Sequence, residues 1–186
     1  MYANIDEIVE AINRESRNYC IGNLQGIRKR LRSLGCQAGS DIFRLTDAMR
    51  RGNYAYHWGG RDEFQFNVRF IEKSDGNYIE YGLAFSLEYM WNKDIVNELR
   101  PRIERFNEFI DRCNGDFSGY YVSVARPDES VEVKPPHDLY IPDDWIEEGN
   151  FISFFNMRKV PADLTGVHAI LQAFDDMLSL YIHAMS

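Results

Sequence analysis

Polar and apolar side chains alternate strictly near the middle of this chain, from residue 63 to residue 70. A period of two places the polar members on one face of a β-strand. Two of them are amides, and an amide pairs with the edge of a nucleic-acid base through two hydrogen bonds. We therefore predict a face that recognises a hydrogen-bonding ligand, made of Glu63, Gln65, Asn67 and Arg69.

A second alternating segment, 80–88, follows a Ser-Asp-Gly-Asn sequence that favours a tight turn. Its large apolar members share one side of the strand, whereas the other side carries the small residues Gly82, Ala84 and Ser86. The sequence thus predicts a hairpin of 63–70 with 80–88. One face of this hairpin is aromatic and apolar, and the other has room for a ligand beside the amides.

An aromatic segment with two adjacent glycines, 54–61, precedes the first strand. Aromatic rings stack on bases, and glycines let a loop bring backbone amides close to a ligand. The alternative is that the glycines only form a turn and that the aromatic residues pack into the core. If this segment binds a ligand together with the strand, the binding residues are Tyr56, His57, Trp58, Arg61, Gln65, Asn67 and Arg69.

Carboxylates around this strand allow an alternative function, metal-dependent cleavage of nucleic acid. The sequence Glu63-Phe-Gln65 is similar to a pattern on strands of metal-dependent nucleases, in which a carboxylate helps to hold the ion. Such a site needs another acid, for which the candidates are Asp47, Asp62 and Glu88. The catalytic set of this alternative is Glu63, Gln65 and Glu88. His57 with Glu63 is either a general acid–base pair or a structural hydrogen bond.

Basic residues gather in the first third of the chain. Residues 1–60 carry nine Lys and Arg against six Asp and Glu, whereas 61–186 carry 12 against 23, within a net charge of −8. Neutralisation of phosphates supplies much of the affinity for nucleic acid. We expect a phosphate-binding set on the outer face of a helix over 24–34, formed by Arg28, Lys29, Arg30 and Arg32.

The remaining periodicity predicts helices and strands around the hairpin. In chain order we expect helices at 5–12, 24–34 and 40–52, the hairpin, a helix at 94–113, a strand at 119–125, an irregular connection at 126–142, a strand at 150–157 and a helix at 161–182.

This element order predicts an α+β fold. The antiparallel sheet is built on the long hairpin and is packed by helices on its aromatic face, with further helices at the N-terminus. We expect one domain over 1–186, in which 1–52 is a helical part and 53–186 is a body of sheet and helices.

Composition limits the class of protein. With 45% hydrophobic and 14% aromatic residues, the chain has the means to bury a core. Its apolar runs are far shorter than the roughly 18 residues of a membrane span. Cys20, Cys36 and Cys113 are odd in number and lack paired metal-ligand spacing, which favours buried, reduced thiols. We expect a cytoplasmic chain without a bound metal, cofactor or membrane.

Four segments together form a pattern that extends over about residues 50–182. They read Tyr56-His-Trp-Gly-Gly-Arg-Asp-Glu-Phe-Gln-Phe-Asn-Val, Tyr81-Gly-Leu-Ala-Phe-Ser-Leu-Glu, Leu99-Arg-Pro-Arg-Ile-Glu-Arg-Phe-Asn-Glu-Phe-Ile and Ile170-Leu-Gln-Ala-Phe-Asp-Asp-Met-Leu-Ser-Leu-Tyr. The pattern resembles an uncharacterised N-terminal module of bacterial HNH-type restriction endonucleases, the modification-dependent defence enzymes.

The resemblance implies a specificity module without its nuclease, because the His-Asn-His and zinc-cysteine residues of the catalytic half are absent from this sequence. We accordingly expect a non-catalytic domain of a restriction or defence system that recognises DNA through a base, whether modified or flipped. Its partners are then DNA and a nuclease domain or subunit. Two alternatives stay open: the metal-dependent nuclease, and a protein-interaction or inhibitor domain that uses the acidic body.

Overall fold

The structure, a computed structural model, describes residues 1–32, 41–113 and 117–186. Within these residues the chain is α+β and forms one seven-stranded sheet. The strands are β1 (Tyr54–Tyr56), β2 (Phe64–Lys73), β3 (Gly76–Ser86), β4 (Tyr120–Ala125), β5 (Val131–Val133), β6 (Phe151–Asn156) and β7 (Val160–Pro161).

The sheet is antiparallel throughout and has the order β1-β2-β3-β6-β4-β5, with β7 beside the first half of β3. The β2–β3 hairpin is its centre, as the alternating pattern predicts, and it pairs Phe64 with Phe85 and Lys73 with Gly76. The predicted hairpin is confirmed.

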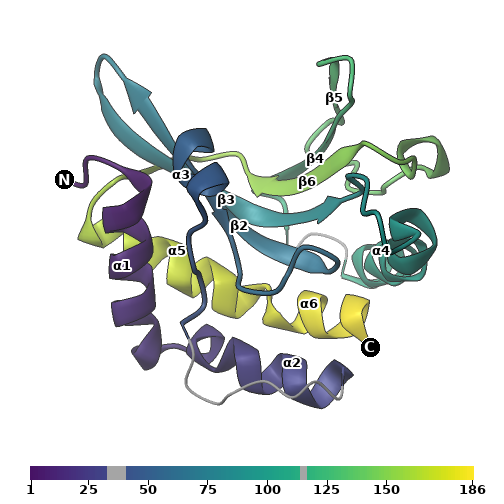
Figure 1. The fold of residues 1–186 in the computed structure, drawn as a ribbon, viewed down its shortest axis with the longest axis horizontal. Coiled ribbons are helices and arrows are strands. Elements are labelled where there is room, and N and C mark those ends of the chain that lie inside the picture. The colour runs from purple at the N-terminus through teal and green to yellow at the C-terminus, as the bar shows by residue number, and fades with distance from the viewer. Residues whose placement is uncertain (33–40, 114–116) are drawn as a thin grey trace.

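Most of the described helices lie on one face of this sheet. The helices are α1 (Ile5–Glu15), α2 (Leu24–Arg32), α3 (Asp47–Gly52), α4 (Ile95–Arg112), α5 (Leu164–Asp176) and α6 (Leu178–Met185), with short 3-10 turns η1 (Ser16–Asn18), η2 (Cys20–Asn23) and η3 (Asp143–Trp145). Figure 1 shows α5 and α6 directly beneath the sheet and α2 beyond them, on the side away from the sheet. The small helix α3 lies on the opposite face.

Aromatic side chains form the centre of the core, between the sheet and the helices. The Phe64 ring stacks on that of Phe85 at 4.2 Å between centroids. The Phe66 ring meets Phe174 of α5 at 4.9 Å and Tyr181 of α6 at 5.2 Å. The alternation therefore assigns the buried face of β2 correctly, because each of these side chains is almost fully buried.

The third predicted helix begins later than expected. The pattern predicts 40–52, but α3 starts at Asp47, with the Thr46 hydroxyl accepting from the Met49 amide at 3.3 Å. The preceding chain is extended, because Phe43 pairs with His57 in an isolated bridge. The Asn13 amide also holds Phe43, donating to its carbonyl at 2.9 Å and accepting from its amide at 3.0 Å.

Two other boundaries differ from the pattern. The final helix is broken at Met177 into α5 and α6, which redirects the chain under the sheet. The connection 126–142 is not irregular throughout, since β5 pairs with β4 after a turn in which Glu129 adopts a positive φ of 65°. The end of the second predicted helix, beyond residue 32, lies outside the described residues.

Cysteines are only partly as predicted. Cys20 and Cys113 are free thiols as predicted, but neither is fully buried. Cys20 is exposed, because it begins the surface turn η2, and Cys113 is half-buried. Cys36 lies outside the described residues.

Phe66→Ala tests the packing of the core. Phe66 is fully buried, so its truncation should cost about 3–5 kcal/mol of unfolding free energy, the usual range for a buried phenylalanine. Urea denaturation followed by circular dichroism measures this. Tyr89→Ala is the control, because that side chain is 65% exposed and its loss should change stability by less than about 0.5 kcal/mol. A loss below about 1 kcal/mol at Phe66 would show that the faces of β2 are assigned wrongly.

Candidate functional site

A cavity of about 580 Å³ lies on the open face of the sheet, opposite the helical layer. It is bounded by α3, β1, β2, the end of β3, β4 and β6. Its lining residues are Thr46, Ala48, Met49, Tyr54, Tyr56, Arg61, Gln65, Asn67, Val68, Arg69, Ser86, Glu88, Ala125, Phe151 and Phe155. Its volume is in the range of small-molecule and cofactor sites.

Two amides of β2 form the floor of this cavity. Gln65 is 1% exposed and Asn67 is 5% exposed. The Asn67 amide nitrogen donates to the Gln65 side-chain oxygen at 3.1 Å and to the Gln65 backbone carbonyl at 3.2 Å. The Gln65 amide nitrogen donates to the Arg61 carbonyl at 3.4 Å. The two amides are thus linked to each other and to the preceding turn.

Aromatic side chains stand on two sides of the floor. On one side, Tyr54 pairs with Arg69 and Tyr56 pairs with Asn67, so both tyrosines point to the open face. Burial raises the pKa of Tyr56, which therefore stays a neutral phenol. On the other side stand Phe151 and Phe155 of β6. These walls supply the stacking surfaces that a planar ligand uses.

Small residues of β3 leave less room than their sequence suggests. A methyl group added at Gly82 would lie 2.7 Å from the Phe155 ring and 2.2 Å from the Phe154 carbonyl. The space beside Gly82 is therefore filled by the Phe155 ring. On this strand the cavity is lined instead by Ser86.

Charged side chains surround the opening. Arg61, Arg69 and Glu88 line the cavity and are exposed. Arg69 has a long contact with Glu80, 3.8 Å between the guanidinium and carboxylate, and Glu80 also pairs with Lys159 at 3.2 Å. Arg61 has no ion pair within the described residues, which leaves its guanidinium available to an anion.

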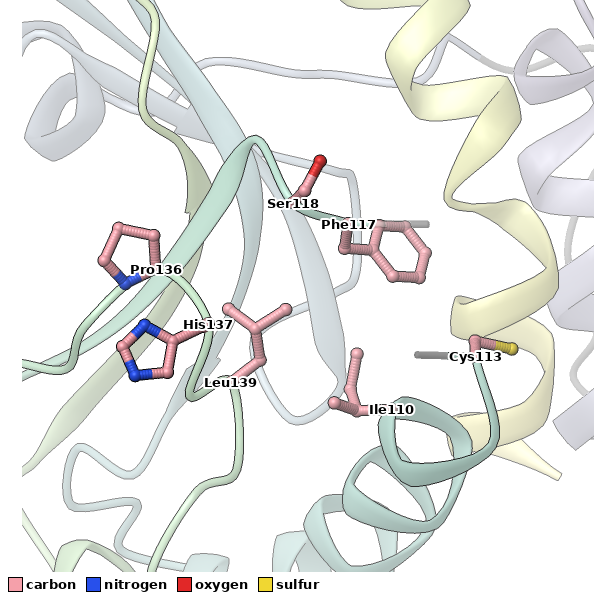
Figure 2. A pocket seen from close by; sticks show the side chains of 7 residues that line it. All are labelled: Ile110, Cys113, Phe117, Ser118, Pro136, His137 and Leu139. Atoms are coloured by element: carbon pink, nitrogen blue, oxygen red, sulfur yellow. The ribbon is translucent and has the colours of Figure 1, made fainter. Parts of the chain in front are cut away.

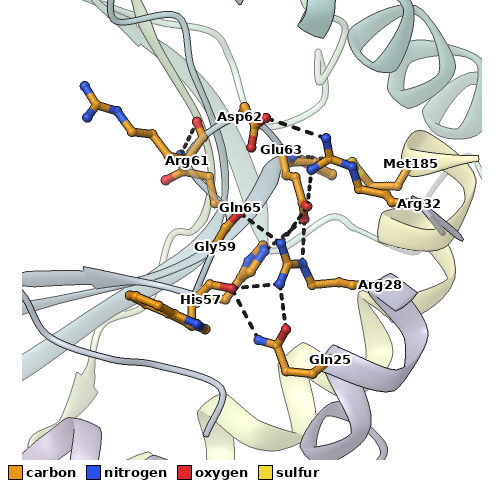
Figure 3. A network of polar contacts seen from close by, with 12 residues as sticks. Gln25, Arg28, Arg32, His57, Gly59, Arg61, Asp62, Glu63, Gln65 and Met185 are labelled. Carbon is orange, nitrogen blue, oxygen red and sulfur yellow. Dashed lines mark hydrogen bonds and ion pairs between the residues drawn. The ribbon is translucent and has the colours of Figure 1, made fainter. Parts of the chain in front are cut away.

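Glu63 and Arg28 form a buried ion pair on the other side of β2 (Figure 3). The Arg28 guanidinium donates to both carboxylate oxygens, from Nη2 to Oε1 at 2.8 Å and from Nε to Oε2 at 3.0 Å. Its remaining donors reach the Gln25 side chain at 2.6 Å and the carbonyls of Trp58 and Gly59 at 2.8 and 2.9 Å. Glu63 is fully buried and Arg28 almost so.

Three more groups complete this network around the Glu63 carboxylate. The Tyr181 hydroxyl donates to Oε2 at 2.9 Å, and His57 Nε2 lies 3.1 Å from the same oxygen. Arg32 forms a second ion pair with Oε1. Since His57 Nδ1 accepts from the Phe66 amide at 3.0 Å, the imidazole proton is on Nε2 and is donated to Glu63.

Burial and pairing set the charges of this network. Burial lowers the pKa of His57, although the Glu63 carboxylate acts in the other direction, so the imidazole is neutral. Burial raises the pKa of Glu63, but the hydrogen bond from His57 and the ion pair with Arg28 outweigh it and hold the pKa well below the ordinary value. Burial and the neighbouring carboxylate raise the pKa of Tyr181 well above 10.

The two adjacent glycines have a structural role in this network. Gly59 has a φ of 77°, a conformation that favours glycine. A methyl group at Gly60 would lie 2.4 Å from His57 Nε2. The turn presents its carbonyls to Arg28, as the Trp58 and Gly59 contacts show. The alternative in which the glycines form a turn therefore describes this segment better than a loop of amide donors aimed at a ligand.

The structure brings together only part of the predicted binding set. Tyr56, Arg61, Gln65, Asn67 and Arg69 line one cavity. His57 is fully buried on the helical side and does not line it. Trp58 is 44% exposed and has the Arg44 guanidinium over its ring at 5.0 Å, but it is not among the lining residues either.

The predicted phosphate-binding set is divided. Placing Arg28 on an exposed helix face is wrong, because the guanidinium is buried against Glu63. Arg32 is also paired with acidic residues. Lys29 and Arg30 are exposed, but they lie on α2, which the layer of α5 and α6 separates from the sheet (Figure 1). The predicted phosphate face and the amide face thus point in different directions.

The residues of the nuclease alternative are not brought together. Glu63 does not share the open face with Gln65, because β2 begins only at Phe64 and the preceding turn directs Glu63 to the helical side. Gln65 and Glu88 line the cavity instead. Among the described residues, no group of three or more His, Cys, Asp and Glu side chains is placed to hold a metal ion.

Some lining residues were not in the predicted binding set. The sequence pattern predicts only a strand for Phe151 and Phe155, but their even spacing places both on one face, which identifies them once β6 is paired with β3. The small size of Ser86 follows from the sequence pattern, but its place in the lining of the cavity does not. Gln25 and Tyr181, which support the network, have no local sequence signal.

A second, smaller cavity of about 340 Å³ lies beside the C-terminal end of α4 (Figure 2). It is lined by Ile110, Cys113, Phe117, Ser118, Pro136, His137 and Leu139. Figure 2 shows the Cys113 sulfur directed away from His137. The arrangement is therefore not that of a thiol–imidazole pair.

Comparisons with protein-family models, with curated proteins and with solved structures found no match to this chain. The resemblance to the N-terminal module of restriction endonucleases thus stays a prediction. Within the described part of the chain, each helix is too short or too polar to cross a membrane.

Glu63→Gln tests the buried ion pair. The variant leaves the buried Arg28 guanidinium without its counter-charge, and loss of one partner of a buried pair typically costs about 3–5 kcal/mol of unfolding free energy. Urea denaturation at pH 7 measures the cost. The matched control is Glu132→Gln, which removes the partner of Arg126 in an exposed pair and should hardly change the midpoint. Equal small effects in both variants would contradict a structural role for the network.

The pH dependence of stability tests the charge states. The folded-state pKa of His57 is below its ordinary value of 6.5, so the unfolded chain takes up a proton that the folded chain does not. Stability should therefore fall as the pH drops below about 6.5. The Glu63 pKa is also lowered, and its contribution, complete above 4.5, should be lost at still lower pH. Urea midpoints between about pH 8 and about pH 2 measure both.

His57→Gln separates the two contributions, because glutamine donates a hydrogen bond but does not titrate. This variant should lose part of the pH dependence between about 6.5 and 4.5 while it keeps the decline at lower pH. Identical slopes in the wild type and the variant would show that His57 is not the neutral buried group.

Proposed function

We propose that this chain is a non-catalytic DNA-recognition domain that reads a base, modified or unmodified, in the cavity on the open face of its sheet. The observation that carries this proposal is the pair of recessed amides, Gln65 and Asn67, between aromatic walls. Amides bind base edges, and aromatic rings bind base faces.

The positive charges around the cavity favour a nucleic-acid ligand, although the net charge of the whole chain does not. The net charge of −8 opposes nonspecific binding of DNA. Arg61 and Arg69 nevertheless lie at the cavity, and Arg44 and Arg51 are exposed beside and within α3. Phosphates next to a bound base would meet these arginines, instead of Lys29 and Arg30 on the far side of the molecule.

The position of Glu63 argues against the metal-dependent nuclease. Glu63 is occupied by two arginines, a histidine and a tyrosine and has no position left for a metal ion. We propose a restriction or defence system in a bacterial cytoplasm as the setting, with a nuclease domain or subunit as partner. The resemblance of the sequence segments supports this setting.

A protein-interaction domain is the second candidate function. The edge strand β5 exposes Val131 and Val133 by 63% and 58%, and Trp91 in the loop after β3 is 85% exposed. Exposed large apolar side chains are common at protein interfaces. In this case the acidic body repels nucleic acid, and the chain binds no DNA even at low salt.

Gln65→Ala and Arg61→Ala test the two parts of the proposal, base recognition and phosphate binding. Removal of the Gln65 amide should weaken binding by an amount that depends on the base presented, because base-edge contacts carry sequence information. Removal of the Arg61 guanidinium should weaken binding to all sequences alike and flatten the salt dependence, by a slope of about 0.9 for each phosphate that is no longer neutralised. Fluorescence anisotropy with methylated, hydroxymethylated and unmodified duplexes at several salt concentrations measures both effects.

Arg30→Ala is the matched control, since Arg30 is an exposed arginine on α2, away from the cavity. It should bind like the wild type. Trp58→Ala should have a smaller effect than Gln65→Ala, because Trp58 does not line the cavity. Wild-type binding by Gln65→Ala to every duplex would exclude this cavity as the recognition site. A wild-type protein that binds no DNA at low salt would favour the interaction domain.

A further inference from the structure

The two floor amides have a fixed orientation. The Asn67 amide nitrogen faces the Gln65 backbone carbonyl, and the Gln65 amide nitrogen faces the Arg61 backbone carbonyl. Rotating either amide by half a turn would place an oxygen against a carbonyl oxygen. The pair therefore acts as one unit, in which both Asn67 N–H groups and the Gln65 side-chain oxygen are already used.

This arrangement leaves a donor on Gln65 and an unoccupied acceptor oxygen on Asn67 for a ligand. The Gln65 amide has a second N–H, and the Asn67 side-chain oxygen accepts no hydrogen bond from any described residue. The nearby Ser86 hydroxyl, in a residue that is 6% exposed, also has no partner within the described residues. Neither of these oxygens is among the fully buried side-chain atoms that lack a partner in the described residues, so each is open to the cavity, where water or a ligand can bind it.

The floor suits a neutral edge and not an anion. The free oxygen of Asn67 would repel a phosphate or carboxylate oxygen, and no cation lies at the floor among the residues that line it. Cations lie at the rim, where Arg61 is exposed. A nucleotide fits both the neutral floor and the cationic rim, because its base has neighbouring donors and acceptors and its phosphate is an anion.

The depth of the amides excludes a base that stays paired. A protein that reads a paired base inserts side chains into a groove of the duplex. Here the amides are at most 5% exposed and lie between the tyrosines of β1 and the phenylalanines of β6. The base must therefore enter the cavity to reach the amides, which requires that it leave the duplex or be unpaired already.

We infer that the floor of the cavity binds the base-pairing edge of a single unpaired base, with Gln65 as donor, Asn67 as acceptor and the adjoining phosphate at Arg61. This inference rests on the proposed function and names the state of the DNA that the site takes.

The test compares duplexes that differ only in the pairing of one central base. In one duplex the base is normally paired, and in the other it stands opposite an abasic site. Each of the four bases is placed at this position, and binding to the full chain is measured by fluorescence anisotropy at constant salt. The best-bound base should bind at least about tenfold more tightly opposite the abasic site, because the energy of unpairing is no longer spent.

Two variants locate the effect. Gln65→Ala should remove most of the advantage of the unpaired base, whereas Gln172→Ala should keep it, since Gln172 is an exposed glutamine on α5, on the helical side of the sheet. Thermal denaturation shows whether Gln65→Ala remains folded. If Gln65→Ala is unfolded, the inference is judged from the wild-type comparison of paired and unpaired bases.

The failures of the inference and of the proposed function are distinguishable. Equal wild-type affinity for the paired and unpaired forms of all four bases, with DNA still bound, overturns the inference and leaves DNA recognition standing. A wild type that binds neither form at low salt overturns the proposed function and the inference with it.

Discussion

The buried carboxylate of Glu63 is the group on which the arrangement of this protein depends. It joins three separate segments: Arg28 and Arg32 come from α2, His57 from the turn after β1, and Tyr181 from α6. A carboxylate without water must find such partners, since a buried and unpaired charge is very costly. The requirement fixes the positions of α2 and α6 relative to the turn between β1 and β2, and so fixes that turn.

The polar groups on the helical side of β2 therefore have their hydrogen-bond partners, whereas a polar group on the open side lacks one within the described residues. Arg28 uses its Nε, Nη1 and Nη2 groups on Glu63, Gln25 and the carbonyls of the turn. On the open side, the Asn67 oxygen has no partner among the described residues. Both sides belong to one strand, so the difference does not come from the backbone. It comes from what packs on each face, which among the described residues is several helices on one side and, of the helices, only α3 on part of the other.

Sequence periodicity predicted the hairpin, its buried face and the position of the cavity, because burial follows the alternation of β2 and β3 directly. It failed for Glu63 and Arg28. Glu63 continues the alternating pattern, and no local signal shows that the strand begins one residue later. Arg28 has the spacing of an exposed helix face, and its partner is 35 residues away in the sequence. A long-range ion pair follows from the three-dimensional arrangement, which local patterns do not contain.

The turn that carries Arg61 connects the two sides. Its carbonyls at Trp58 and Gly59 are held by Arg28, and its next residue supplies the carbonyl of Gly60 to the Glu63 amide at 3.1 Å. The Arg61 carbonyl then orients the Gln65 amide, while the Arg61 side chain lies at the cavity. The floor donor and the rim cation are thus positioned by the same turn. Because the buried network fixes this turn from beneath, the geometry of the cavity is set before a ligand arrives, and the protein gives up little conformational freedom when a ligand binds.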